Sequence, residues 1–303
     1  MKTILPPYLK PGDTIGLIAA AGYMPEEKFA KCIDVLKDRG YRILMGKTPG
    51  HRFHYFSGND KLRQADLQKM LDNEKVKAIL SVRGGYGSIR IVDGLDFKKF
   101  VKQPKWLIGF SDITVFLNHI YTKYNIGSLH APMAAAFDEG EGINEYVQSL
   151  LDALEGKKAH YHADAHPFDH KGKCSGTLVG GNLMLLVNLI GTPSMPDMKN
   201  KILFIEDTGE YIYSIDRMMY HLKRSGNLRK LRGLVVGRFS DMKDTDNPFG
   251  QSVEEVIRDI MKEYDYPVCF NFPVGHQTEN YALKVGAAYT LEVGKSGTVL
   301  SEK

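Results

Sequence analysis

Three polar residues of the chain each follow or end a short apolar run, and their types are those of a serine hydrolase triad. Ser111 follows the apolar run 106–109, and Glu206 and His276 likewise follow apolar segments. A serine hydroxyl is a poor nucleophile at neutral pH unless an adjacent base takes its proton. In a triad the imidazole is that base, and a carboxylate fixes its tautomer. The order Ser, Glu, His is one of the orders that such triads adopt along a chain.

The run before Ser111 breaks at Gly109, and an amphipathic segment resumes from Asp112. This pattern predicts a strand that turns sharply into a helix, a nucleophile elbow with Ser111 as the nucleophile, His276 as the base and Glu206 as its orienting partner. Each residue also has an ordinary interpretation. Ser111 is also typical of a helix cap, Glu206 of a capping or ion-pair residue, and His276 of a loop histidine.

A glycine loop at residues 83–87 supplies a candidate oxyanion hole. Glycine has no Cβ, so its backbone can approach a ligand closely. We expect an amide of Gly84 or Gly85, together with the amide of Asp112, to stabilise a tetrahedral intermediate. The alternatives are a phosphate-binding loop and a plain structural turn. Against phosphate binding, the loop lacks both the Lys-Ser/Thr ending of a P-loop and the GxGxxG spacing of a dinucleotide site.

Arg83 stands beside this loop and is a candidate for binding a substrate carboxylate. A peptidase that acts at a free chain end must recognise the terminal carboxylate, and a guanidinium is suited to that task. The alternative role of Arg83 is a structural ion pair.

Metal and cofactor sites are not predicted. A group of histidines has no neighbouring cysteine ligands and no helical HExxH frame, which favours solvent-exposed side chains over a metal site; these are His160, His162, His166 and His170. The three cysteines are widely spaced and form no CxxC pair, which fits a reducing compartment.

The elements that must position the site follow from hydrophobic periodicity. Short apolar runs alternate with amphipathic stretches through the first half, a pattern typical of βαβ units and a mostly parallel sheet. Active sites of such sheets lie beyond the carboxyl ends of the strands. Ser111 and the loop 83–87 both follow strands, so we expect them to face one crevice.

A chain of 303 residues suggests two domains. We expect an α/β N-terminal domain at residues 1–158 with the nucleophile elbow, and a C-terminal domain at 173–303 with Glu206 and His276. Residues 159–172 are polar, rich in His and Lys, and without clear period, which is typical of a linker.

The overall composition makes some classes of binding partner unexpected. The 40 basic and 36 acidic residues give a formal net charge of +4 and are interspersed, so nucleic acid is not an expected partner. No apolar run reaches the length of a membrane span. We therefore expect a protein of the cytoplasm that does not bind membranes.

Six motifs of the chain, in the same order, resemble those of the LD-carboxypeptidases. These are serine peptidases of murein recycling, and the family includes the microcin-immunity peptidases. The motifs are Lys10-Pro-Gly-Asp-Thr-Ile-Gly16, Arg83-Gly-Gly-Tyr-Gly-Ser88, Gly109-Phe-Ser-Asp-Ile-Thr114, Gly180-Gly-Asn-Leu183, Leu203-Phe-Ile-Glu-Asp207, and Pro273-Val-Gly-His276 followed by Asn280.

The resemblance implies the triad Ser111, His276 and Glu206 between two domains, a homodimer, and no metal requirement. It implies release of D-alanine from murein tetrapeptides in the cytoplasm, by cleavage after the L-centre of a diamino acid. It also implies an α/β domain followed by a mixed-sheet or barrel-like domain.

The chain departs from the family pattern at Phe110, where Tyr is common, at Ala131, where Gly is usual, and at Lys284, which replaces a frequent proline. None of these changes removes a catalytic group, but they leave the preferred substrate open. The alternatives are a serine peptidase that detoxifies a peptidyl-nucleotide of the microcin type, and a non-catalytic module that binds murein peptides.

Overall fold

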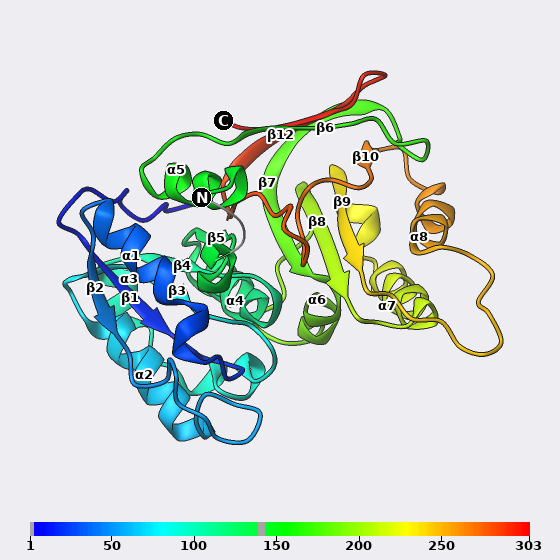
Figure 1. The fold of residues 1–303 in the computed structure, drawn as a ribbon. Helices are drawn as coiled ribbons and strands as arrows, with labels where there is room; N and C mark the ends of the chain where they lie inside the picture. The colour runs from blue at the N-terminus through cyan, green and yellow to red at the C-terminus, as the bar shows by residue number, and fades with distance from the viewer. Residues whose placement is uncertain (1–2, 139–142) are drawn as a thin grey trace. The chain divides into compact units, whose positions relative to one another are not determined.

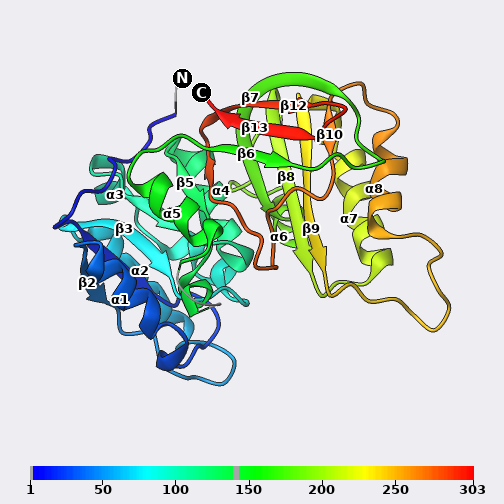
Figure 2. The same cartoon turned by 45° about the horizontal axis from the view of Figure 1, so that its top comes forward.

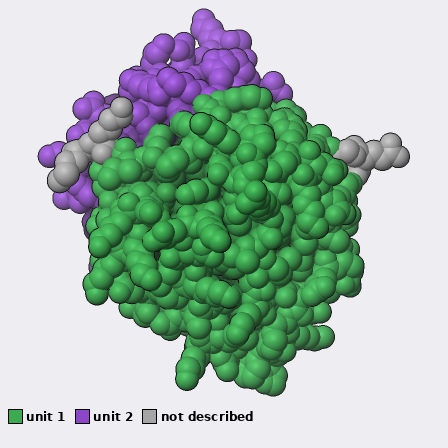
Figure 3. Space-filling view, turned by 90° about the vertical axis from the view of Figure 1, so that its left-hand side faces the viewer, with its two compact units in different colours: residues 1–157, 281–285 green, residues 158–280, 286–303 purple. Residues whose placement is uncertain are grey.

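The computed structural model describes residues 3–138 and 143–303, which form two compact units (Figures 1 and 3). Unit 1 comprises Met1–Lys157 and Tyr281–Val285, and unit 2 comprises Lys158–Asn280 and Gly286–Lys303. The sequence did not predict that residues 281–285 return to unit 1.

Unit 1 is built on a six-stranded sheet in the order β11-β5-β4-β3-β1-β2 (Figure 1). The strands from β2 to β5 run parallel, and only β11 pairs antiparallel, with β5. The bounds are β1 (Thr14–Ile18), β2 (Arg42–Met45), β3 (Val76–Ser81), β4 (Trp106–Ile108), β5 (Ser128–His130) and β11 (Leu283–Val285). The strand order reverses at β1, so the ends of β1 and β3 flank a switch point where ligands bind in such sheets.

Helices cover both faces of this sheet. One face, with Ile15 and Leu17, packs with α1 (Ala30–Asp38), α5 (Glu145–Leu154) and the 3-10 helix η5 (Ala134–Asp138) in a common buried core. On the other face Gly16 contacts Met70 of α2 (Asp60–Asp72). The helix α3 (Lys98–Lys102) packs on α2, and α4 (Thr114–Tyr124) packs on β4 and β5. The α/β fold with a mostly parallel sheet is confirmed.

Unit 2 is built on a seven-stranded mixed sheet in the order β10-β9-β8-β7-β12-β13-β6 (Figure 2). The strands β10, β9, β8 and β7 run parallel, and β7, β12, β13 and β6 pair antiparallel. The bounds are β6 (His160–Ala163), β7 (Gly172–Asn182), β8 (Lys201–Thr208), β9 (Gly233–Ser240), β10 (Val268–Cys269), β12 (Ala288–Val293) and β13 (Thr298–Glu302). This is the mixed-sheet form of the two predicted alternatives.

Three helices accompany the parallel half of this sheet: α6 (Leu183–Leu189), α7 (Ile212–Arg224) and α8 (Val253–Met261). Each contacts the next, and α6 also packs on β7 and β8. Figure 2 shows α7 and α8 side by side. The helix α8 begins with a capping box in which Ser252 and Glu255 each accept the other's backbone N–H, which fixes its first turn.

Two elements of unit 2 differ from the sequence-based expectation. The strand β6 lies inside residues 159–172, which were predicted to be a linker, and pairs with β13 at the edge of the sheet. The strand β7 continues through four glycines, a composition that is unusual in a strand; these are Gly172, Gly176, Gly180 and Gly181. Among the described residues, no helix is long and apolar enough to cross a membrane.

Candidate active site

Ser111 occupies a strained backbone position at the end of β4. The strand ends at Ile108, and Ser111 opens the 3-10 helix η4 (Ser111–Ile113), which continues into α4. Its φ is +60°, in the left-handed region. This conformation costs a non-glycine residue about 1–2 kcal/mol. A strained residue between a strand and a helix is the geometry of a nucleophile elbow.

The helix-cap interpretation of Ser111 does not fit this geometry. Phe110 occupies the cap position of η4, and Ile113 that of α4. Within unit 1, Ser111 Oγ makes no hydrogen bond to a described residue. The hydroxyl is therefore available for chemistry.

The glycine loop after β3 lies directly against Ser111. A Cβ on Gly84 would stand 2.8 Å from Ser111 Cβ and 3.4 Å from the backbone nitrogen of Asp112. Gly85 has a φ of +107°, and a Cβ there would stand 3.2 Å from Gly22 Cα. No described residue accepts a hydrogen bond from the amides of Gly84, Gly85 or Asp112. Of the expected oxyanion donors, Gly84 and Asp112 thus lie against the serine in unit 1, and Gly85 is the next residue of the same loop.

The side chain of Asp112 joins the elbow to the far end of the glycine loop. Its Oδ2 accepts the backbone N–H of Ser88 at 2.7 Å, and the carboxyl group is buried. Burial raises the pKa of Asp112, while hydrogen bonds from Ser88 and Gly87 and the charge of Arg63 oppose that rise. Asp112 therefore has a positioning contact beyond the amide that the sequence predicted.

Arg83 is exposed, and its Nη1 donates to the carbonyl of Tyr23 at 2.8 Å. No carboxylate of a described residue pairs with this guanidinium. The structural ion pair considered as its alternative role is therefore not formed in the described part of the chain, and the remaining N–H groups of Arg83 are available to a ligand.

Glu206 and His276 come together in unit 2. Glu206 lies near the end of β8 and is fully buried, and its Oε2 is 2.6 Å from His276 Nδ1. The His276 side chain retains 17% exposure. The pairing of β8 with β9 shifts register between Ile205 and Asp207, and such irregularities often lie beside active sites.

The loop that carries His276 is held by its backbone. The N–H of Arg238 donates to the carbonyl of Val274 at 2.8 Å, and the N–H of Gly275 donates to Asn280 Oδ1 at 3.2 Å. A Cβ on Gly275 would stand 2.9 Å from the Arg238 carbonyl oxygen. Glycine is therefore required at position 275 for the close approach that places the histidine.

The electrostatics of this pair favour a protonated imidazole. Burial alone lowers the pKa of His276, but the charge and hydrogen bond of Glu206 outweigh burial, with further help from Asp207 and Asp241. The result is a pKa above the ordinary value of histidine. In a catalytic triad, a carboxylate in this position stabilises the imidazolium that forms when the histidine takes the proton of the nucleophile.

Asp207, for which the sequence predicted no role, holds the first turn of α6. Its carboxylate accepts hydrogen bonds from Asn182 Nδ2 at 2.8 Å, from the Thr208 N–H at 2.9 Å and from the Met184 N–H at 2.9 Å. Burial and the charge of Glu206 raise its pKa to about 7. Its place next to Glu206 in the motif Leu203-Phe-Ile-Glu-Asp207 is the feature of the sequence that could have indicated a role near the site.

The predicted residues thus form two groups. Ser111, Gly84, Gly85, Asp112 and Arg83 belong to unit 1, and Glu206 and His276 belong to unit 2. Within residues 3–138 and 143–303 no three His, Cys, Asp or Glu side chains are grouped so as to hold a metal ion. Of the four histidines of residues 159–172, His160 and His162 lie side by side on β6, with their Nε2 atoms 3.1 Å apart.

Comparisons with known proteins describe both halves of the chain. The LD-carboxypeptidase N-terminal domain model matches residues 15–131, and the LD-carboxypeptidase C-terminal domain model matches residues 175–291. A protein of Bacillus subtilis (strain 168) named "Probable murein peptide carboxypeptidase" is 32% identical over 298 residues, which cover 97% of this chain and 93% of the relative.

Two further similarities concern the fold and the microcin branch. The crystal structure of muramoyltetrapeptide carboxypeptidase from Oxalobacter formigenes matches with a TM-score of 0.87 and 31% identity, over 95% of this chain and 98% of that one. The microcin C7 self-immunity protein of Escherichia coli is 25% identical in an alignment that covers 96% of this chain and 94% of the relative.

Proposed function

This chain belongs to the LD-carboxypeptidase family, and on that premise we propose that it is a serine carboxypeptidase acting on murein tetrapeptides. The bond cleaved is the amide between the L-centre of a diamino acid and the terminal D-alanine. Ser111 is the nucleophile, His276 the general base and acid, and Glu206 the orienting carboxylate.

The first half-reaction begins with proton transfer from Ser111 to His276. With its Nδ1–H donating to Glu206, the imidazole is in the tautomer whose Nε2 accepts the serine proton. Ser111 Oγ then attacks the carbonyl carbon, and the carbonyl oxygen becomes an oxyanion. The amide of Asp112 and an amide of Gly84 or Gly85 donate to this oxyanion, each contributing about 3 kcal/mol.

Collapse of the tetrahedral intermediate breaks the C–N bond. His276 gives its proton to the departing amine, so D-alanine leaves with a neutral amino group and the peptide remains as an ester on Ser111. Water then attacks the ester, His276 takes one proton from it, and that proton returns to Ser111 Oγ as the tripeptide acid departs.

The observation that carries the proposal is the contact between His276 and Glu206. A fully buried carboxylate 2.6 Å from an imidazole nitrogen is the arrangement that fixes a catalytic tautomer. The positive φ of Ser111 and the unused amides beside it support the complementary role of unit 1. The proposal requires His276 Nε2 to reach Ser111 Oγ in the working enzyme.

The substrate is tested with a panel of peptides followed by mass spectrometry. The panel contains a murein tetrapeptide, the same peptide ending in L-alanine, and its C-terminal amide. We expect rapid removal of the terminal residue from the first peptide, none from the L-alanine peptide, and only slow release of D-alaninamide from the C-terminal amide. Equal cleavage of the L-alanine peptide would overturn the assignment of LD specificity.

A second candidate function is hydrolysis of a peptidyl-nucleotide by the same three residues. The similarity to the microcin C7 self-immunity protein over 96% of this chain favours it as the alternative. Adding an aminoacyl-nucleotide amide to the panel separates the two functions, because release of the nucleotide moiety without release of D-alanine supports the second. A tight peptide complex without turnover of either compound supports a binding module.

We further propose that the enzyme is a cytoplasmic homodimer that needs no metal or organic cofactor. Its supports are the family resemblance and a triad mechanism that supplies base, nucleophile and oxyanion donors from the chain itself. Sedimentation of the purified protein and activity after dialysis against a chelator examine the dimer and the metal independence.

A further inference from the structure

Arg63 is a buried arginine that no step of the proposed mechanism uses. It lies in the first turn of α2 and has 0% exposure. Burying a guanidinium is costly unless its N–H groups are paired. Its partners are therefore informative about what this side chain does.

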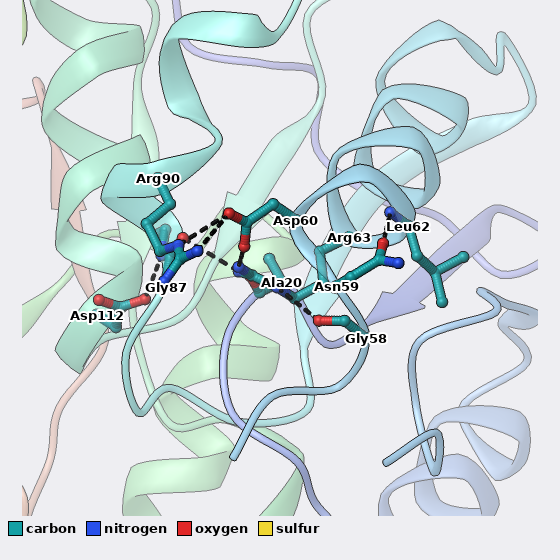
Figure 4. A network of polar contacts seen from close by, with 10 residues as sticks. Ala20, Gly58, Asn59, Asp60, Leu62, Arg63, Gly87, Arg90 and Asp112 are labelled. Carbon is teal, nitrogen blue, oxygen red and sulfur yellow. Dashed lines mark hydrogen bonds and ion pairs between the residues drawn. The ribbon is translucent and has the colours of Figure 1, made fainter. Parts of the chain in front are cut away.

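The guanidinium of Arg63 joins three backbone segments at one edge of the unit 1 sheet (Figure 4). Its Nη1 donates to the carbonyl of Ala20 and, at 3.1 Å, to the carbonyl of Gly87, and its Nε donates to the carbonyl of Gly58 at 3.1 Å. These carbonyls follow β1, precede α2 and end the glycine loop. The fork is completed by an ion pair with Asp60.

Gly87 is pressed onto this guanidinium. Its φ is +134°, and a Cβ on it would stand 2.6 Å from Arg63 Nη1. The adjacent Ser88 N–H donates to the carboxylate of Asp112, the residue after the nucleophile. The guanidinium of Arg63 and the carboxyl group of Asp112 thus hold neighbouring peptide groups at the far end of the loop.

The near end of the loop is held by a separate contact. The N–H of Gly22 donates to the carbonyl of Gly84 at 3.0 Å. The Gly84 carbonyl and the Gly85 N–H belong to one peptide group, so the Gly85 amide lies in the stretch between this contact and the hold on Gly87. With both ends of this stretch held, the direction of the Gly85 amide is restricted.

We propose that Arg63 is a positioning residue for the oxyanion hole, which fixes the glycine loop through Gly87 so that its amides face the oxyanion on Ser111. This inference rests on the proposed function, in which Ser111 is the nucleophile. Oxyanion donors act only when held in place before the reaction, since they are aimed at a charge that exists only transiently. Arg63 itself touches no reacting atom.

Arg63→Lys is the variant that tests the proposal. It keeps the positive charge facing Asp60 and Asp112, but a lysine ammonium cannot reproduce a planar fork to the carbonyls of Ala20, Gly58 and Gly87. We expect kcat to fall about 10²-fold, the effect of losing one oxyanion donor, with KM within about threefold of wild type.

Arg90→Lys is a matched control. Arg90 also pairs with Asp60, at 2.7 Å, and both arginines lie over the ring of Phe56, with the guanidinium carbons of Arg63 and Arg90 at 4.8 Å and 5.3 Å from the ring centroid. The side chain of Arg90 is 45% exposed and donates to no carbonyl of the glycine loop in the described part of the chain. Its backbone N–H donates to the Gly87 carbonyl at 3.2 Å, a contact that Arg90→Lys keeps. We expect its kcat to stay within about twofold of wild type, a surface effect.

A second readout separates positioning from a purely structural role. A peptide boronate that forms a tetrahedral adduct with a serine should lose affinity for Arg63→Lys by the same factor as kcat/KM, because the adduct uses the oxyanion donors. The tripeptide product, which lacks that charge distribution, should bind as it does to wild type. Equal losses of both affinities, or a kcat within threefold of wild type, would overturn the proposal.

Gly87→Ala keeps the proposal testable if Arg63→Lys does not fold. Its methyl group displaces the loop end from an unchanged Arg63, so we expect the same loss of boronate affinity with retained product affinity. Wild-type boronate affinity in this variant would contradict the proposal. A Ser111→Ala protein that still releases D-alanine at the wild-type rate would instead show that the proposed function has failed.

Discussion

Gly84 lies directly against Ser111, so that a methyl group on the glycine would stand 2.8 Å from the serine Cβ and 3.0 Å from its Oγ. Gly84 does not have a positive φ, unlike Gly85 and Gly87. A substitution at position 84 therefore tests the space beside the nucleophile with little backbone strain.

We expect Gly84→Ala to lower kcat/KM by about 10²-fold, because the methyl group must push the amide or the serine away from its place. Gly294→Ala is the control, since among the described residues a Cβ there comes within 4 Å of the Gly297 carbonyl oxygen alone, at 3.4 Å. The measurement is D-alanine release from tetrapeptide by both variants. Full activity of Gly84→Ala would remove the loop from the oxyanion hole.

Glu206→Gln should change both the rate and its pH dependence. The neutral form of His276 is the active base, so kcat/KM falls as pH drops through its pKa, which Glu206 holds above the ordinary value. Without that negative charge the pKa falls and the acidic limb moves to lower pH, while kcat/KM at the plateau drops about 10³- to 10⁴-fold.

The profile of kcat/KM against pH measures both effects. Glu279→Gln is the control, because it removes a carboxylate that pairs with Arg238 beside the same loop, whereas the raised pKa of His276 is due to Glu206, Asp207 and Asp241. An acidic limb at the same pH in Glu206→Gln and wild type would contradict the assigned pairing.

Arg83→Ala should weaken recognition of the free chain end. If Arg83 binds the terminal carboxylate, its loss raises KM for the tetrapeptide about 10- to 100-fold, the value of a hydrogen bond to a charged group. Cleavage of the C-terminal amide, already slow, should not change. Unaltered discrimination between acid and amide in the variant would leave Arg83 with only its contact to Tyr23.

Asp207 should make the protein less stable as pH rises. Its folded pKa of about 7 lies above the usual value of 3.8, so between those values the folded state holds a proton that the unfolded state has released. Stability contributed by this proton is complete at low pH and is lost as pH rises from about 4 to about 7.

Urea unfolding of wild type and Asp207→Asn at several pH values measures this effect. We expect the free energy of unfolding of wild type, relative to the variant, to fall across that window by no more than about 4 kcal/mol. A difference that is constant with pH would contradict the raised pKa.

The sequence could predict the parts of the fold whose signals are local. The apolar run before Ser111 and the break at Gly109 predicted the end of β4 and the sharp turn, and the structure has both. The parallel sheet followed from alternating strands and helices. Glu206 and His276 followed apolar segments, and the structure adds the contact between them.

Other parts had a weak or misleading local signal. The edge strand β6 alternates exposed His160 and His162 with half-buried Tyr161 and Ala163, but the alternation covers only a short stretch that is rich in His and Lys and was predicted to be a linker. Glycine is typical of turns and weakens a strand, but a Cβ on Gly180 would collide with the Phe204 carbonyl oxygen, so glycine is what lets β7 and β8 pair. Contacts set by tertiary packing override the pattern at these positions.

Buried charges were also invisible to the sequence. Arg63 and Lys284 sit in patterns where a cation is normally exposed, yet both are buried. Lys284 in β11 donates to the carbonyl of Lys157 at 3.1 Å and lies over the ring of Tyr8, contacts that only the return of residues 281–285 to unit 1 creates.

The most direct test of the central claim is the rate at which Ser111→Ala protein releases D-alanine from a murein tetrapeptide. The account predicts a fall of at least about 10⁴-fold relative to wild type, because no other group in the mechanism can form the acyl-enzyme. Release at the wild-type rate by the folded variant would contradict it.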